Sequence, residues 1–126
     1  MPYDYDNQNI FAKILRGEIP NDTVLETDHA LAFNDIGPQA PVHVLIIPKG
    51  PYVCFDHFAI EASDTEIADF NRAVAKVSQM TGVAPGAGGN GYRAIANCDD
   101  DGGQEVPHFH IHIVGGHNLG PMLSKA

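Results

Sequence analysis

The segment His108-Phe109-His110-Ile111-His112-Ile113-Val114 decides the fold of this chain, because histidine alternates in it with large apolar residues. Alternation with period two indicates a β-strand, whose successive side chains leave the backbone on opposite faces. We therefore expect the three histidines on one face, roughly 6 to 7 Å apart, and Phe109, Ile111 and Ile113 on the other. Such an apolar face is typical of a sheet that packs under a helix.

The histidine face of this strand points to chemistry. Imidazole fills a core poorly, and neighbouring rings would repel one another if more than one were charged. A solvated strand face would normally carry Thr, Lys or Glu instead. We therefore interpret the three histidines as the centre of a reactive site.

The whole chain has the size and composition of one globular domain over residues 1–126. This length buries roughly two thirds of the unfolded surface without disulfides. Its residues are 44% hydrophobic and 18% charged, and no apolar run approaches the ~20 residues of a membrane span. The acidic start, residues 1–6, lacks the basic and apolar segments of a secretion signal, so we expect a cytoplasmic protein.

The net charge of −9, with only seven Lys and Arg, argues against partners such as nucleic acid or an anionic membrane. A phosphate-bearing substrate would have to be held locally by backbone N–H groups, neutral side chains and histidines. Cys54 and Cys98 form no Cys-x-x-Cys pair. We expect them to be free thiols, with no cysteine zinc site.

The remaining patterns predict an α+β fold. Segments 49–62, 84–91 and 98–105 are expected to be irregular, as Gly and Pro or acidic runs interrupt them. Regular elements are expected as a helix over 7–16, a hairpin of strands 23–26 and 30–34, a strand over 42–48, a long helix from the capping box Ser63–Glu66 to Gly82, and a strand over 92–97. With the histidine strand, these give an antiparallel sheet of about five strands with the long helix across one face.

One further histidine, His43, interrupts the apolar strand 42–48 near its start. A lone histidine in a buried strand is more often a core residue with satisfied nitrogens than a catalytic one. The run Asp99-Asp100-Asp101 lacks the spacing of an EF-hand and is interpreted as a solvated turn.

The segment Asp101–Gly116, which contains His108-Phe109-His110-Ile111-His112-Ile113-Val114, resembles the signature of the histidine-triad (HIT) superfamily, His-x-His-x-His followed by two apolar residues. The stretches Ile10–Pro20 and Ala32–Lys49 are similar to its Hint branch. The resemblance covers nearly the whole chain in the right order, and it raises His43 to a member of the expected site.

This resemblance implies a nucleotide-binding hydrolase that cleaves purine nucleoside phosphoramidates, conjugates of AMP or GMP, at the α-phosphate. The middle histidine, His110, would be the nucleophile and would become transiently nucleotidylated before water releases the nucleoside monophosphate. His108, His112 and His43 would orient it and supply hydrogen bonds or protons. The family mechanism requires neither a metal nor a cofactor.

The resemblance also implies a nucleotide site and a homodimer. The two sheets of the dimer would join through central strands and the long helices. The residues that match phosphate-contacting positions are Asn97, Gly103 and Gln104. Those that match positions holding base and ribose are Ile10, Phe11, Phe33, Asp35 and Ile36, where the carboxylate of Asp35 can accept from both ribose hydroxyls.

Two departures from the Hint pattern bear on specificity. Glu105 stands where many Hint proteins have a small hydroxyl residue, and an anion there is expected to alter which leaving groups are tolerated. The tail over residues 117–122 lacks the tryptophan that some members place near the partner's site.

Three other functions compete with phosphoramidate hydrolysis. The first is hydrolysis of dinucleoside polyphosphates, as in the Fhit branch, which Gly115-Gly116 after the triad disfavours. The second is a zinc site formed by the three strand histidines, which is disfavoured because residues in a line do not easily surround one ion. The third is a non-enzymatic nucleotide-binding adaptor, which an assay of phosphoramidate turnover would separate from an enzyme.

Overall fold

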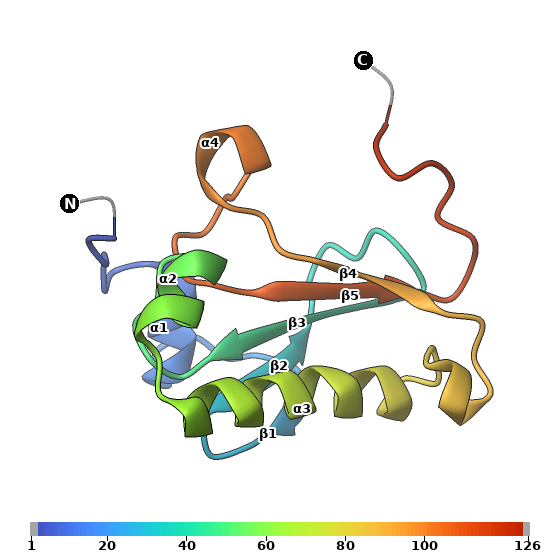
Figure 1. The fold of residues 1–126 in the computed structure, drawn as a ribbon, viewed down its shortest axis with the longest axis horizontal. Coiled ribbons are helices and arrows are strands. Elements are labelled where there is room, and N and C mark those ends of the chain that lie inside the picture. The colour runs from blue at the N-terminus through green and yellow to red at the C-terminus, as the bar shows by residue number, and fades with distance from the viewer. Residues whose placement is uncertain (1–2, 125–126) are drawn as a thin grey trace.

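The computed structural model describes residues 3–124, which form an α+β fold around a five-stranded antiparallel sheet (Figure 1). The strand order is β1-β2-β3-β5-β4. The elements, in chain order, are α1 (Ile10–Leu15), β1 (Thr23–Glu26), β2 (Ala30–Asn34), β3 (Val42–Pro48), α2 (Phe55–Glu61), α3 (Asp64–Met80), the 3₁₀ turn η1 (Pro85–Ala87), β4 (Tyr92–Ile95), α4 (Asp99–Gly102) and β5 (Ile111–Gly115). The expected fold class is confirmed.

The two faces of the sheet bury two separate apolar clusters, because side chains alternate along each strand. Ala30 and Ala32 of β2 belong to the cluster that contains Phe70 of α3. Leu31 and Phe33 of the same strand belong to the other cluster, with α1. The long helix α3 therefore covers one face, as predicted (Figure 1), and α1 packs against the opposite face.

Helix α3 begins at the predicted capping box. The backbone N–H of Glu66 donates to Ser63 Oγ at 3.2 Å, and the backbone N–H of Ser63 donates to Glu66 Oε1 at 3.1 Å. These two bonds satisfy donors that lack partners at a helix start. The helix ends at Met80, and Gly82 follows with a φ of +79°, which glycine adopts without strain.

Strand β3 is the centre of the sheet, as its nearly unbroken apolar run predicts. It pairs with β2 on one side and with β5 on the other, and six of its residues, His43 to Pro48, are buried, including the histidine that interrupts the run. The hairpin strands 23–26 and 30–34 have the predicted bounds. The edges of the sheet are β1 and β4.

All three segments predicted to be irregular contain a short helix, and within 84–91 this is the 3₁₀ turn η1. Helix α2 lies within 49–62 and is stabilised by the burial of Phe58 in the cluster under α3. A helix of seven residues is too short to show a clear periodic pattern in the sequence, so it was not predicted. The single turn α4 lies within 98–105.

Three predicted boundaries were too generous. The first helix begins at Ile10, with Asn9 as its cap, and not at residue 7. The strand predicted over 92–97 ends at Ile95. The ladder of β5 begins at Ile111, so that His108 and His110 precede the regular strand. Within residues 3–124, no helix has the length and apolarity needed to cross a bilayer.

Candidate active site

The segment that leads into β5 keeps its predicted alternation although only its second half is a regular strand. Phe109 and Ile113 lie in the cluster under α3. His110 lies on the other side, where its ring meets that of Phe11 edge-on, with centroids 5.0 Å apart. His108 is fully buried and does not belong to an open face.

His110 is held by the backbone of its own segment. Its Nδ1 lies 2.7 Å from the carbonyl oxygen of His108. A carbonyl can only accept a hydrogen bond, so Nδ1 carries the proton and Nε2 keeps the lone pair in the neutral ring. Burial lowers the pKa of His110, partly offset by the bond to that carbonyl, and this keeps the ring neutral. A neutral imidazole with a fixed Nδ1–H is the form that a nucleophile requires.

His108 positions His110, because its carbonyl oxygen accepts the hydrogen bond from His110. Its Nε2–H donates to the carbonyl oxygen of Pro48 at 2.8 Å, and its Nδ1 accepts from the Tyr5 hydroxyl at 2.6 Å. Burial lowers the pKa of His108 to about 4. With both nitrogens occupied, this ring positions the carbonyl that holds His110. Sequence reasoning missed Tyr5, because its partner lies 103 residues away and nothing local marks it.

His43 and His112 form a second hydrogen-bonded pair on neighbouring strands. The backbone N–H of Gln39 donates to His43 Nδ1 at 3.1 Å, so the proton of His43 is on Nε2. That Nε2 lies 2.9 Å from His112 Nδ1 and 3.4 Å from Asp35 Oδ2. His112 Nδ1 must then accept, which places the proton of His112 on Nε2. Burial, followed by the charges of His110 and His43, lowers the pKa of His112 to about 4.

A cavity of about 410 Å³ opens between α1, β2 and the segment before β5. Ten of the residues expected at the site line it: Ile10, Phe11, Phe33, Asp35, Ile36, Asn97, Gly103, Glu105, His110 and His112. No Lys or Arg is among the lining residues. The cavity therefore has two histidines, neutral polar groups and carboxylates on an apolar base.

The lining residues divide into a floor and a rim. Phe11 and Phe33 are buried and meet edge-on, with centroids 5.6 Å apart. Ile10 is 45% exposed and Ile36 is fully exposed, so these two lie at the rim. Asp35 is partly engaged, because its Oδ1 accepts from the backbone N–H of Gly37 at 2.7 Å.

Three of the expected residues do not line this cavity. His108 lies behind it, and His43 borders a neighbouring cavity that it shares with His112. Gln104, expected at the phosphate, turns its amide nitrogen to the carbonyl oxygens of Val53 and Val106, at 2.6 and 2.9 Å. Its side chain therefore organises the loop, a role that the sequence did not indicate.

The possible metal ligands differ from those of the zinc alternative. His108 uses both ring nitrogens in hydrogen bonds, so the three strand histidines do not converge on one point. Asp35, His43 and His112 do converge, with one donor atom of each within 4.8 Å of the others. One oxygen and two imidazole nitrogens form a donor set that zinc accepts.

The family model of the HIT domain matches residues 16–119. The chain belongs to the HIT family. The E. coli K12 protein named purine nucleoside phosphoramidase is 42% identical over 117 residues, which are 93% of this chain and 94% of that protein. An uncharacterized HIT-like protein of Azospirillum brasilense is 54% identical over 125 residues, which are 99% of both chains.

Solved HIT structures share the fold. The HIT family hydrolase from Clostridium thermocellum has a TM-score of 0.80 and 36% identity, and the match covers 94% of this chain and 99% of that one. In sequence and fold, the chain is therefore a HIT family hydrolase-like protein.

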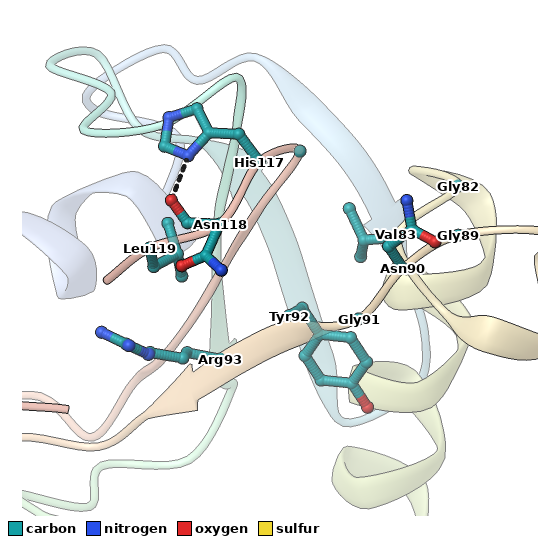
Figure 2. Close-up of a pocket in the computed structure, with 11 residues that line it drawn as sticks. Gly82, Val83, Gly89, Asn90, Gly91, Tyr92, Arg93, His117, Asn118 and Leu119 are labelled. Carbon is teal, nitrogen blue, oxygen red and sulfur yellow. Dashed lines mark hydrogen bonds between the residues drawn. The ribbon is translucent and has the colours of Figure 1, made fainter. Parts of the chain in front are cut away.

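A second cavity of this HIT protein, about 560 Å³, lies away from the histidine site. Figure 2 shows it between the glycine-rich loop over 82–91, the start of β4 and residues 117–119. The Nδ1–H of His117 donates to the carbonyl oxygen of Asn118 at 3.0 Å, and His117 is the only histidine among the lining residues of this cavity. This cavity contains none of the expected site residues, so the smaller cavity is the candidate active site.

Proposed function

We propose that this HIT protein hydrolyses purine nucleoside phosphoramidates at the α-phosphate through a nucleotidyl intermediate on His110. The observation that carries the proposal is the tautomer of His110. Its Nδ1–H is fixed on a backbone carbonyl, so the lone pair is on Nε2, and the residue lines the 410 Å³ cavity. The relative named purine nucleoside phosphoramidase supports the choice of substrate.

The reaction proceeds in two displacements at phosphorus. His110 Nε2 attacks the α-phosphorus, the bond from phosphorus to the amine nitrogen breaks, and the amine leaves as it takes a proton. Water then attacks the same phosphorus and releases a proton, the bond to Nε2 breaks, and nucleoside monophosphate departs. Over the two steps one water is consumed. Its hydroxyl is bound to phosphorus in the nucleoside monophosphate, and its remaining proton replaces the one taken up by the amine.

His112 is the hydrogen-bond donor of this mechanism. Its ring centroid lies 4.9 Å from that of His110, and its proton is on Nε2 because His43 occupies Nδ1. The Nε2–H of His112 can therefore donate to a phosphoryl oxygen or to the leaving nitrogen while the imidazole is neutral. His43 acts as a positioning residue, since its contact with the phosphate would run through His112.

The remaining lining residues suit a nucleotide. The rings of Phe11 and Phe33 offer apolar surface to a base, and Asp35 keeps lone pairs for ribose hydroxyls beside its bond to Gly37. Asn97 and Gly103 offer neutral donors for the phosphate. Because no cationic side chain lines the cavity, a substrate with little negative charge beyond one phosphate fits best.

The test is turnover of an adenosine phosphoramidate by His110→Ala and His110→Asn. We expect a loss of several orders of magnitude in kcat with measurable AMP binding, because a lost nucleophile removes the covalent path. His117→Asn, which changes a histidine outside the site, is the matched control. A His110 variant that retains more than about a tenth of the wild-type rate would reject the role.

Zinc-dependent hydrolysis is the second candidate, favoured by the convergence of Asp35, His43 and His112. The same assay with EDTA separates the two. Under our proposal the rate is unchanged, because the histidines use their nitrogens in hydrogen bonds to one another and to the backbone. Activity that EDTA abolishes and zinc restores would favour the metal.

A homodimer also belongs to the proposal. The resemblance implies a junction through central strands, but β2, β3 and β5 each already have a neighbour on both sides, so a second sheet can pair only with an edge strand. We assign this role to β4. Its residues Tyr92 and Ile95 are partly exposed apolar side chains, 40% and 36%. Pairing two β4 strands would place them at the centre of a continuous sheet.

A further inference from the structure

Both cysteines of the chain meet at one carboxylate, far apart though they are in sequence. Cys54 Sγ donates to Asp56 Oδ1 at 2.9 Å, and Cys98 Sγ lies 3.8 Å from the same oxygen. One donor atom of each residue lies within 4.8 Å of the others. Both cysteines are free, and none of the three residues lines the proposed active-site cavity.

We propose that Cys54, Asp56 and Cys98 bind a soft divalent cation of the Zn²⁺ type, at a structural site separate from the catalytic histidines. Zinc binds thiolate at about 2.3 Å and carboxylate at about 2.0–2.2 Å, which places tetrahedral ligands roughly 3.3 to 3.8 Å apart. The Cys98 Sγ to Asp56 Oδ1 distance of 3.8 Å lies in that range. The Cys54 Sγ to Asp56 Oδ1 distance of 2.9 Å is that of a thiol hydrogen bond, and it would lengthen by about 0.6 Å once a cation replaces the proton between the two atoms. Binding would displace the two thiol protons and form two metal–sulfur bonds.

The carboxylate is already oriented for this role. Its second oxygen, Oδ2, accepts a hydrogen bond from the Tyr3 hydroxyl, while Oδ1 faces the two thiols. The Tyr3 ring is in turn stacked on His57, with centroids 4.8 Å apart. Hydrogen bonds of this kind hold ligating carboxylates in metal sites. Asp56 and Cys98 are exposed, so water can complete a tetrahedron.

The donor chemistry favours a cation over a disulfide. A carboxylate is a zinc ligand, whereas it takes no part in a disulfide. The negative charge of Asp56 would add to those of two thiolates around a divalent ion. The sequence predicts no cysteine zinc site, because Cys54 and Cys98 form no Cys-x-x-Cys pair, and only the fold brings the two residues together.

The bound cation would join two segments beside the active site. Cys54 precedes α2, and Cys98 precedes α4, which stands next to α2 at the end of the sheet where β5 begins (Figure 1). Gln104 already ties these segments through the carbonyl of Val53. Cys98 follows Asn97, a lining residue of the cavity, but none of the three proposed ligands lines the cavity itself, so removal of the cation should lower stability and leave the rate of hydrolysis unchanged.

Cobalt is the probe for this site, because Co²⁺ substitutes for zinc and absorbs by charge transfer only when thiolates bind it. We expect the reduced protein, titrated without oxygen, to develop this absorption, to saturate at one Co²⁺ per chain, and to lose it when Zn²⁺ is added. Cys98→Ser and Asp56→Asn should each weaken binding at least about tenfold. Asp101→Asn, which removes one charge from the same loop, should leave it unchanged.

Absence of the absorption in the wild-type protein would overturn the proposal, and so would absorption that survives Cys98→Ser. A cation held by Asp35, His43 and His112 gives no sulfur charge transfer and is therefore distinguished. Thermal unfolding provides the second measurement: Zn²⁺ should raise the midpoint of the reduced wild-type protein and not that of Cys98→Ser. Both altered positions are exposed, so their variants should fold.

Discussion

At the scale of single residues, the chemistry rests on which nitrogen of each ring is protonated. Backbone groups fix three of these choices directly: the carbonyls of His108 and Pro48, and the N–H of Gln39. His112 follows, because its Nδ1 must accept from His43. The four rings are thus set as neutral tautomers in the absence of substrate, which would reduce the reorganisation that the proposed reaction requires.

Glu105 is the residue whose effect on specificity is most directly testable. It lines the cavity, and an anion there should repel a polyphosphate leaving group more than a neutral amine. We predict that kcat/KM is higher for a nucleoside phosphoramidate than for a dinucleoside polyphosphate. Glu105→Ser and the closer isostere Glu105→Gln should narrow this gap by improving the polyphosphate.

The control for this comparison is Glu18→Gln, which neutralises an exposed carboxylate outside the cavity. It should leave the ratio of the two kcat/KM values unchanged. If the ratio stays constant in both Glu105 variants as well, then Glu105 does not determine the leaving group.

How much of the site could be predicted differs from residue to residue. The alternation in 108–114 sufficed to place Phe109 and His110 on opposite sides, because strand geometry dictates it. Tyr5 could not be found, since a hydrogen bond across 103 residues leaves no local pattern. Gln104 is expected at the phosphate, but its side-chain amide N–H groups donate to the carbonyl oxygens of Val53 and Val106.

At the scale of elements, those with their own local signals were predicted well. The hairpin, β3 and α3 have turn residues, an apolar run and a capping box, and their positions are confirmed. Helix α2 has no such signal, and it is stabilised by a tertiary contact, the burial of Phe58. The late start of β5 has a similar cause, because the Phe109 N–H donates to the carbonyl of Tyr52, outside the sheet.

The cap of α3 gives a prediction at this scale. Ser63→Ala removes the oxygen that accepts from the Glu66 N–H, and should lower the free energy of unfolding by about 1 kcal/mol. Ser63→Thr keeps an accepting hydroxyl and should cost less. Urea unfolding monitored by circular dichroism measures both. Equal stability of Ser63→Ala and the wild type would show that the cap contributes nothing.

At the scale of the whole molecule, buried neutral histidines make stability depend on pH. The folded pKa of His108 is about 4 against an ordinary 6.5, so the unfolded chain binds more protons between these values. The stabilisation is complete above pH 6.5 and is lost as the pH falls towards 4. This shift corresponds to about 3 kcal/mol, and His112 shifts in the same direction.

Urea unfolding at pH 7.5, 6 and 5, at one protein concentration, tests this dependence. The free energy of unfolding should decrease at each step. Carboxylates with lowered pKa values, such as Asp56 at about 2, lose their contribution only at more acidic pH. A free energy of unfolding that is constant from pH 7.5 to 5 would mean that burial does not lower the pKa values of His108 and His112.

The proposed dimer concerns the edges of the sheet. Strand β1 and strand β4 are its two edges, and the proposed dimer joins two copies of β4. We predict that light scattering at micromolar concentration gives twice the mass of one chain. Ile95→Lys should reduce the measured mass to that of one chain, because a charge on an edge strand opposes pairing with another strand.

The control is Thr23→Lys, which places the same charge on β1 and should leave the dimer intact. A monomeric wild type would reject the assembly, and a dimer broken by Thr23→Lys but not by Ile95→Lys would move the interface to the opposite edge.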